Sequence, residues 1–215
     1  MYSTLFFDLD GTLVDSGLGI TRCAQYALRK MGIDVEVLDS LRPFVGPPLE
    51  DSFIDFYGMS HAEAQQAVEA YRERYFSKGI YEQTPYPGVF EFMHEVKRKG
   101  YRTAITTSKI ERMAKLVIND LFPQFAPYID YIFARDEDGH RHTKADVIRH
   151  GLSVCGITDT NEVLMIGDRK YDIIGAKECG LDSCGILHGY GNVDEFEKAG
   201  ATYICESYSD LIKIL

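Results

Sequence analysis

The sequence predicts an α/β fold in which an all-helical cap domain is inserted into a doubly wound parallel sheet core. Short apolar runs alternate with helical patterns over residues 82–215, which is typical of a parallel sheet with helices on both faces. An apolar run at residues 4–9 has the same character as those later runs. Residues 16–81, in contrast, contain successive helical patterns and no convincing strand. We therefore expect a core of residues 1–15 and 82–215 and an insert of residues 16–81.

The first element is a buried strand within the stretch TLFFDLDGTLVD, residues 4–15. Its apolar and aromatic residues have strand preference and surround Asp8. Gly11 and Thr12 then interrupt the run. The strand should therefore end where two carboxylates, Asp8 and Asp10, follow each other with one residue between them.

The insert is expected to consist of helices alone. Apolar residues recur at helical spacing from Leu18 and stop at Gly32, a residue type common just past a helix end. Pro48 suits the first turn of a helix. Ser60 and Glu63 have the spacing of a capping box, which marks a further helix start. The expected helices cover residues 18–31, 35–41, 48–57 and 60–76.

The rest of the chain alternates between the two kinds of element. Gly100 and Gly180 end helical patterns, and Thr143 is placed as the N-cap of another helix. The expected helices cover residues 88–99, 111–121, 144–155 and 171–179. The expected strands cover residues 101–107, 131–134, 162–166, 183–187 and 202–205.

Composition limits the possible partners. The 215 residues carry a formal charge of -10 with no basic block, so we expect no binding to nucleic acid or to an anionic membrane. No apolar run approaches the ~18 residues that span a bilayer, and the N-terminus has no basic region typical of a secretory signal. Five scattered cysteines without a C-x-x-C pair indicate reduced thiols. We therefore expect a cytoplasmic protein.

Carboxylates are expected to gather at one edge of the sheet. In a strand, residues i and i+2 point to the same side, so Asp8 and Asp10 should emerge together. Asp168 and Thr107 each follow a later strand, and Asp172 lies near the start of the next helix. Ligands of open α/β sheets bind beyond the carboxyl ends of the strands. Four carboxylates converging there would repel one another, and a hard divalent cation with oxygen ligands would relieve the conflict.

The alternative is that these groups only cap strands and helices. Asp168 is a reasonable N-cap, and a carboxylate in the first turn, such as Asp172, is favoured by the helix dipole. Thr107 and Ser108 are also good caps, although a hydroxyl at this place can donate to a phosphoryl oxygen beside a helix N-terminus. Lys144 begins a helix, where the dipole disfavours a cation. It should therefore have a partner, either a carboxylate such as Asp172 or a phosphate, unless it is simply solvated.

The ordered set of these motifs resembles the haloacid dehalogenase superfamily over the whole chain. FFDLDGTLVDS is similar to its first motif, Thr107 in AITTSK to its second, Lys144 to its third and GDRKYD to its fourth. One departure is that Ala145-Asp146 follow Lys144, where relatives often carry Lys-Pro. The helical insert is similar to the first-type cap of the phosphoglycolate phosphatase and β-phosphoglucomutase branch, and FVGPP most resembles the phosphoglycolate phosphatase-like group. The resemblance also implies a Rossmann-like core.

The resemblance implies phosphoryl chemistry on Asp8. That residue would be the nucleophile that forms an aspartyl-phosphate. Asp10 would protonate the leaving alcohol and then activate the water that hydrolyses the intermediate. Dehalogenases lack this second aspartate, so its presence favours a phosphatase or a phosphomutase. We expect hydrolysis, with a sugar-phosphate mutase as the alternative and a non-catalytic partner-binding member as a third possibility.

The resemblance also implies a Mg²⁺ cofactor. Its ligands would be the Asp8 and Asp168 carboxylates and the Asp10 backbone carbonyl, while Asp172 supports the metal shell or orients Lys144. The groups expected to bind the substrate or its phosphate are Gly11, Thr107, Ser108, Lys144 and, in the insert, Arg42. Thr107 and Lys144 would also be catalytic, because they would neutralise the nonbridging phosphoryl oxygens in the transition state.

The substrate is expected to be a small phosphorylated metabolite. Arg42 would meet a substrate carboxylate, as in phosphoglycolate, unless it is only a surface residue. The insert carries seven Lys or Arg against nine Asp or Glu, which does not favour a highly anionic substrate. Phosphoglycolate, nucleoside monophosphates, pyrophosphate and sugar phosphates remain open, and we expect a monomer or a weak homodimer.

Overall fold

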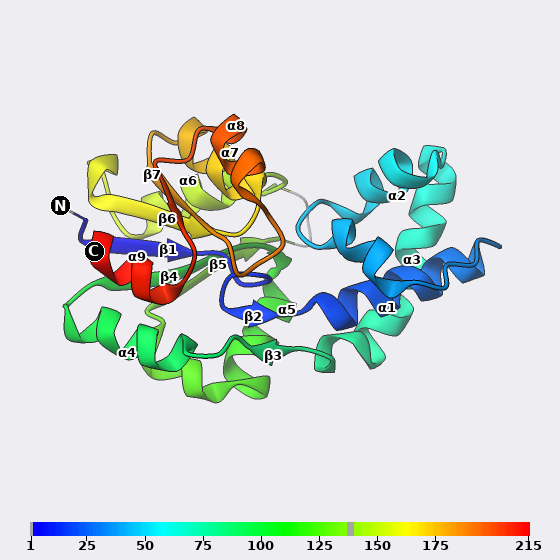
Figure 1. The fold of residues 1–215 in the computed structure, drawn as a ribbon, viewed down its shortest axis with the longest axis horizontal. Helices are drawn as coiled ribbons and strands as arrows, with labels where there is room; N and C mark the ends of the chain where they lie inside the picture. Colours follow the sequence, from blue (N-terminus) through cyan, green and yellow to red (C-terminus); the bar gives the residue numbers. More distant parts are fainter. Residues whose placement is uncertain (1, 137–139) are drawn as a thin grey trace. The chain divides into compact units, whose positions relative to one another are not determined.

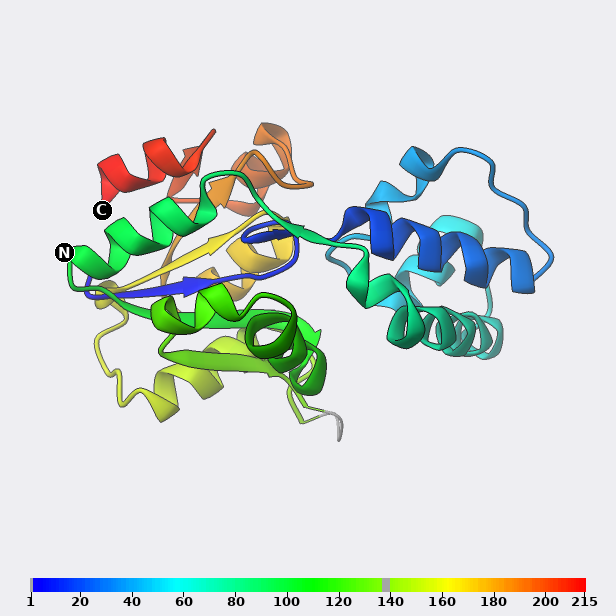
Figure 2. The same ribbon diagram turned by 90° about the horizontal axis from the view of Figure 1, so that it is seen from below.

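The computed structural model describes residues 2–136 and 140–215, which divide into two compact units (Figures 1 and 2). The larger unit runs to Val14 and resumes with Pro85–Leu215. The smaller unit is Asp15–Thr84.

The larger unit contains a six-stranded sheet in the order β5-β4-β1-β6-β7-β8, and all of its strand pairs are parallel. The strands are β1 Thr4–Phe7, β4 Arg102–Ile110, β5 Tyr131–Arg135, β6 Val163–Gly167, β7 Asp182–Ile186 and β8 Tyr203–Cys205. The helices are α4 Val89–Arg98, α5 Glu111–Lys115, α6 Lys144–Val154, α7 Lys170–Glu178, α8 Val193–Ala199 and α9 Tyr208–Ile214. They flank both faces of the sheet, which confirms the predicted α/β fold (Figure 1).

Successive residues of β1 show why this strand is largely apolar. Phe6 points to one face, where it packs with Phe133 and with residues of α6 and α7 in a buried cluster. Phe7 points to the other face, where its ring meets Phe92 of α4, which in turn stacks on Tyr208 of α9. Because helices cover both faces, the side chains of β1 after Thr4 are apolar on both faces.

Several elements differ from the sequence prediction. Helices α8 and α9 were not expected, because segments of seven residues are too short to show a clear helical period. The single helix expected at 111–121 is α5 followed by a π-helix, η3 Leu116–Leu121. Two short strands, β2 Val14–Asp15 and β3 Thr84–Pro85, pair in a separate two-stranded sheet. The remaining 3₁₀ turns of the larger unit are η4 Pro123–Tyr128 and η5 Thr160–Glu162.

The smaller unit is helical, and its α-helices begin and end close to where the sequence predicts. It contains α1 Gly17–Lys30, η1 Leu38–Phe44, α2 Leu49–Tyr57, α3 His61–Ser77 and η2 Gly79–Tyr81. The predicted capping box is present, with Ser60 and Glu63 each bonded to the backbone of the other. The helix expected at 35–41 is instead the 3₁₀ helix η1, which contains Pro43. Phe44 at its end packs against the aromatic rings of α2.

Helix α1 and η2 approach each other so closely that only glycine fits between them. The Gly19 amide donates to the Glu82 carbonyl, and a Cβ on Gly19 would lie 2.2 Å from the carbonyl oxygen of Gly79. A backbone atom cannot move away as a flexible side chain can. The packing of this unit therefore depends on the absence of a side chain at Gly19.

We expect Gly19→Ala to destabilise the protein. Overpacking of this kind costs about 1–3 kcal/mol, and here the clash is with backbone. Urea denaturation would measure the loss of unfolding free energy. Gln66→Ala, on the exposed side of α3, is the control and should change stability little. Equal stability of Gly19→Ala and wild type would contradict the packing argument.

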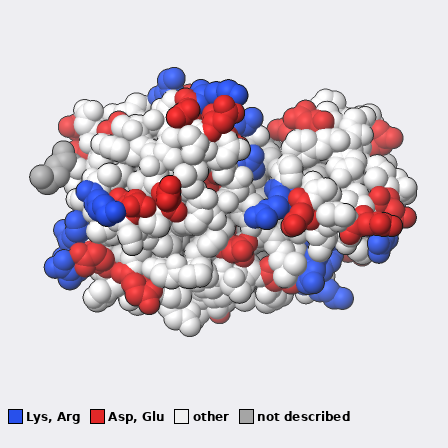
Figure 3. Space-filling model, in the orientation of Figure 1, with Lys and Arg blue, Asp and Glu red and all other residues white. Residues whose placement is uncertain are grey.

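The distribution of surface charge and the state of the cysteines are as expected from the sequence. On the face shown in Figure 3, acidic and basic side chains are interspersed and the basic ones form no broad area. Among residues 2–136 and 140–215, no helix combines the length and apolar character needed to cross a membrane. The five cysteines are free thiols, as the sequence predicts.

Candidate active site

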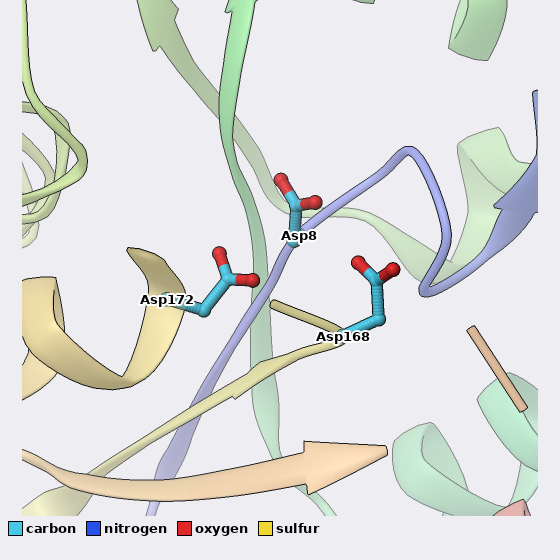
Figure 4. Close-up of side chains that lie close together, drawn as sticks. All are labelled: Asp8, Asp168 and Asp172. Atoms are coloured by element: carbon cyan, nitrogen blue, oxygen red, sulfur yellow. The ribbon is translucent and has the colours of Figure 1, made fainter. Parts of the chain in front are cut away.

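Two adjacent strands end in aspartates at the same edge of the sheet. Asp8 directly follows β1 and Asp168 directly follows β6, and these strands pair in parallel with Phe7 opposite Ile166. Asp172 comes from the first turn of α7. Oxygen atoms of the three carboxylates lie within 4.8 Å of one another, and Figure 4 shows them turned toward a common space. All three side chains are buried.

Burial and mutual repulsion make this group of carboxylates electrostatically costly. Burial raises the pKa of Asp8 to about 6, with further contributions from Asp172 and Asp10, and Lys144 offsets part of the effect. Burial, together with the charges of Asp8 and Asp172, raises the pKa of Asp168 well above its usual range. The atoms that these three side chains offer to a metal are all carboxylate oxygens, and hard divalent cations prefer oxygen ligands. The three aspartates therefore fit a divalent metal ion.

Lys144 is the cation that the structure places beside these aspartates. Its Nζ lies 2.7 Å from Oδ1 of Asp8 and 2.7 Å from Oδ1 of Asp172, and it donates to the Thr106 carbonyl at 2.9 Å. Burial by itself would lower the pKa of Lys144, but the charges of Asp172 and Asp8 outweigh burial and raise that pKa above its usual value. The expected carboxylate partner of Lys144 is thus confirmed.

Local structure brings Lys144 to this position. Thr143 caps α6 and forms a capping box with Asp146, which fixes the first turn that carries Lys144. Gly175 of α7 lets the lysine stem pass, since a Cβ there would lie 2.8 Å from Cγ of Lys144. One lysine can therefore reach both Asp8 and Asp172.

Asp168 is held by the turn that follows β1 and by the loop after β7. Its Oδ2 accepts a hydrogen bond from the Tyr190 amide at 2.9 Å, and its Oδ1 accepts one from the Thr12 hydroxyl at 3.4 Å. Gly11 has φ of 89°, and a Cβ on it would lie 2.1 Å from Oδ2 of Asp168. Gly11 is therefore required for the close approach of the turn to this carboxylate.

Of the four carboxylates predicted to converge, three lie within 4.8 Å of one another, and the Asp10 side chain is not part of that group. Strand β1 ends at Phe7, and the amides of Leu13 and Val14 both donate to the Leu9 carbonyl. The chain thus turns before Asp10, and the alternation of side chains along a strand no longer applies. Oδ2 of Asp10 instead lies 2.8 Å from Nζ of Lys109.

Comparison with known proteins agrees with this geometry. The family model described as haloacid dehalogenase-like hydrolase matches residues 5–186. The chain belongs to this family. Among its relatives, a 5′-nucleotidase of Pseudomonas aeruginosa is 36% identical over 214 residues, covering 100% of this chain and 96% of that protein. A phosphoglycolate phosphatase of Aquifex aeolicus is 25% identical over 219 residues, covering 98% and 95%.

A solved structure supports the same assignment. The crystal structure of a predicted phosphatase from Clostridium acetobutylicum has a TM-score of 0.94 and 39% identity, and covers 100% of this chain and 98% of that one. The resemblance drawn from the four motifs is therefore confirmed. This haloacid dehalogenase-like protein is an enzyme, a hydrolase of the phosphatase type.

The other predicted site residues lie in two places. Thr107 is buried in β4, and its hydroxyl oxygen accepts a hydrogen bond from the Lys109 amide at 3.2 Å, while Ser108 is half-buried. Arg42 lies in η1 of the smaller unit, where its exposed guanidinium is 4.0 Å from the Asp39 carboxylate. The roles of these three residues in substrate binding stay predictions.

Lys109 is the charged residue near Asp10 that sequence reasoning did not assign to the site. The available signal was a lysine two residues after Thr107, at the end of a strand whose neighbours carry carboxylates. That signal does not indicate which residue Lys109 contacts. Asp10 is distant from Lys109 in the sequence, and the turn that changes the direction of the chain before Asp10 was not predicted.

Proposed function

We propose that this enzyme is a magnesium-dependent phosphomonoesterase that forms an aspartyl-phosphate on Asp8. The observation that carries the proposal is the position of the Asp8 carboxylate, which pairs with Lys144 and lies beside the buried carboxylates of Asp168 and Asp172. Phosphoryl transfer requires mainly positioning and positive charge around the phosphoryl oxygens. A lysine and a cation held by these aspartates would supply both.

The reaction would proceed in two displacements at phosphorus. One oxygen of Asp8 is held by Lys144, so the other is available to attack phosphorus as the bond to the leaving alcohol breaks. Asp10 gives its proton to the leaving oxygen. Asp10 then takes a proton from a water molecule, which attacks phosphorus and releases inorganic phosphate and the Asp8 carboxylate.

The residues that would hold Mg²⁺ are Asp8 and Asp168, with the Asp10 backbone carbonyl as a further donor and Asp172 completing the shell or orienting Lys144. When bound, the cation would offset the charge of the carboxylates and of the phosphoryl oxygens. Lys144 bridges Asp8 and Asp172, so it would keep both in place as charge develops. Thr107 and Ser108 are proposed to hydrogen-bond to the phosphoryl group.

For the substrate class we propose nucleoside 5′-monophosphates. The support is the 5′-nucleotidase relative, which matches the whole chain at 36% identity. The phosphoglycolate phosphatase relative matches at 25%. Phosphoglycolate, pyrophosphate and sugar phosphates are the competing substrates, and a role of Arg42 at a substrate carboxylate belongs to the phosphoglycolate case. We further propose a cytoplasmic monomer or weak homodimer that binds neither nucleic acid nor membrane.

A panel of phosphorylated metabolites tests this proposal. We expect Mg²⁺-dependent phosphate release, with the highest kcat/KM for a nucleoside 5′-monophosphate. A higher kcat/KM for phosphoglycolate would change the substrate class but keep the reaction. Isomerisation of a hexose phosphate without net phosphate release would instead favour a mutase of the β-phosphoglucomutase type. No turnover of any substrate would contradict the proposed activity.

A further inference from the structure

We propose that Lys109 is a positioning residue that holds the carboxylate of Asp10 for proton exchange. Its ammonium group fixes one oxygen of Asp10 and leaves the other to meet the leaving group and then the water. This inference rests on the proposed function, because the proton exchange by Asp10 is part of that reaction.

The contact between Lys109 and Asp10 is short and largely removed from solvent. Nζ of Lys109 lies 2.8 Å from Oδ2 of Asp10, with side chains that are 7% and 15% exposed. An exposed ion pair contributes little free energy and restrains its side chains weakly. Separating a buried ion pair is costly, because it leaves an uncompensated charge away from solvent. The position of the Asp10 carboxylate is therefore tied to Lys109.

The backbone on both sides of this contact is also fixed. Asp10 forms a bridge with Val14, and the Gly11 amide donates to the Val14 carbonyl at 2.8 Å. On the other side, the Lys109 amide donates to the Thr107 hydroxyl oxygen. With both backbones held, the ion pair determines which way the Asp10 carboxylate faces.

The second oxygen of Asp10 has no protein partner. Oδ1 is buried and accepts no hydrogen bond from the residues that the structure describes. A buried carboxylate oxygen without a partner is destabilising, and such atoms are rare except where a ligand or water supplies the missing bond. The leaving oxygen of the substrate, and later the attacking water, are groups that bond to this atom in the proposed reaction.

Lys144 and Lys109, both near the strand ends, contact different aspartates. Lys144 contacts Asp8 and Asp172, which belong to the nucleophile and the metal site. Lys109 contacts Asp10, whose side chain is outside that group. We therefore expect substitution of Lys109 to slow the steps in which Asp10 exchanges a proton, and to leave the attack of Asp8 on phosphorus unaffected where the leaving group needs no proton.

Leaving-group dependence tests the proposal with Lys109→Met. An alkyl phosphate such as glycerol 1-phosphate has a basic leaving oxygen that needs a proton, whereas 2,4-dinitrophenyl phosphate releases a stable anion without one. General acid–base catalysis contributes about 10²–10⁴-fold, and loss of its alignment removes part of this. We expect the first-turnover rate, measured by rapid quench, to fall roughly 10- to 100-fold for the alkyl phosphate and by less than about threefold for the dinitrophenyl ester.

A second expected result comes from the hydrolytic step. Asp10 must also activate water, so Lys109→Met should give a burst of about one equivalent of dinitrophenolate followed by slow turnover. Lys109→Arg, which can still pair with Asp10, should restore most of the alkyl phosphate rate. Lys115→Met is the matched control, because Lys115 is 53% exposed and pairs with Glu111 of its own helix.

Two results would overturn the inference. Equal losses of first-turnover rate on both substrates would mean a general structural role, and a raised KM with unchanged rates would mean that Lys109 contacts the substrate. If Lys109→Met does not fold, as judged by its thermal unfolding, Lys109→Arg is compared on the same two substrates, and a uniform change there has the same meaning. The proposed function is judged separately, because it fails only if the wild type lacks phosphate release or Asp8→Asn retains it.

Discussion

Asp8→Asn is expected to reduce kcat by a factor on the order of 10⁴–10⁶, as removal of a catalytic nucleophile does in other enzymes. The amide keeps the shape of the side chain but cannot attack phosphorus to form an acyl-phosphate. It also removes one of the charges that repel each other beside Asp168 and Asp172, so the folded protein should not lose stability for electrostatic reasons. The effect is therefore expected on chemistry and not on folding.

Phosphate release and trapping of the intermediate measure this effect. Acid quench of the wild type during turnover of a ³²P-labelled substrate should leave label on the protein, and Asp8→Asn should carry none. Asp194→Asn is the matched control, because Asp194 is a 73% exposed aspartate that pairs with Lys198 of the same helix, α8. Label on the Asp8→Asn protein, or turnover equal to that of the control, would rule out Asp8 as the nucleophile.

The positions of Asp8 and Asp168 could be predicted from the sequence, because the same rule about parallel strands applies to both residues. The carboxyl ends of parallel strands meet at one edge, and both residues directly follow a buried apolar strand. The contact of Lys144 with Asp172 followed from the unfavourable place of a lysine at a helix start. These predictions required only that each segment be recognised as a strand or a helix, and did not require the exact residue at which the segment ends.

The Asp10 side chain is not in the close group of carboxylates, and its direction could not be predicted because it depends on where β1 ends. The i, i+2 rule holds only inside a strand, and β1 ends at Phe7, so the tight turn around Leu9 directs Asp10 toward Lys109. Nothing in local sequence fixes such a contact between distant segments. Helices α8 and α9 were missed for a related reason, since each buries so few side chains that no apolar period is visible.

The second large effect is expected from metal binding. Because the pKa of Asp8 is raised to about 6 by burial and neighbouring charge, the metal-free folded state binds more protons than the unfolded state above the usual aspartate pKa. The contribution of this residue to stability therefore falls as pH rises from about 4 to 6, since ionisation disfavours the folded form. Burial and the charges of Asp8 and Asp172 also raise the pKa of Asp168 well above its usual range, so its ionisation disfavours the folded form in the same direction. A cation held by these carboxylates should reverse this loss of stability.

We therefore expect Mg²⁺ to raise both activity and stability. At a Mg²⁺ concentration 100 times its Kd, the stabilisation is about 2.7 kcal/mol, which corresponds to a rise in Tm of roughly 5–10 °C. The difference in Tm with and without Mg²⁺ should grow between about pH 5 and pH 7, as the carboxylates ionise. Chelation by EDTA should abolish phosphate release, and added Mg²⁺ should restore it.

The Asp168→Asn variant distinguishes an effect on Mg²⁺ binding from an effect on the stability of the metal-free protein. Asp168 is fully buried, and its carboxylate is held by Tyr190 and Thr12. The substitution removes a repelling charge, so the metal-free variant should be at least as stable as the wild type. It also removes a ligand, so the Mg²⁺-induced rise in Tm and the phosphate release should both be lost, while Asp194→Asn retains both. A full Mg²⁺ shift in Asp168→Asn would mean that the cation, if it binds, is held by other groups.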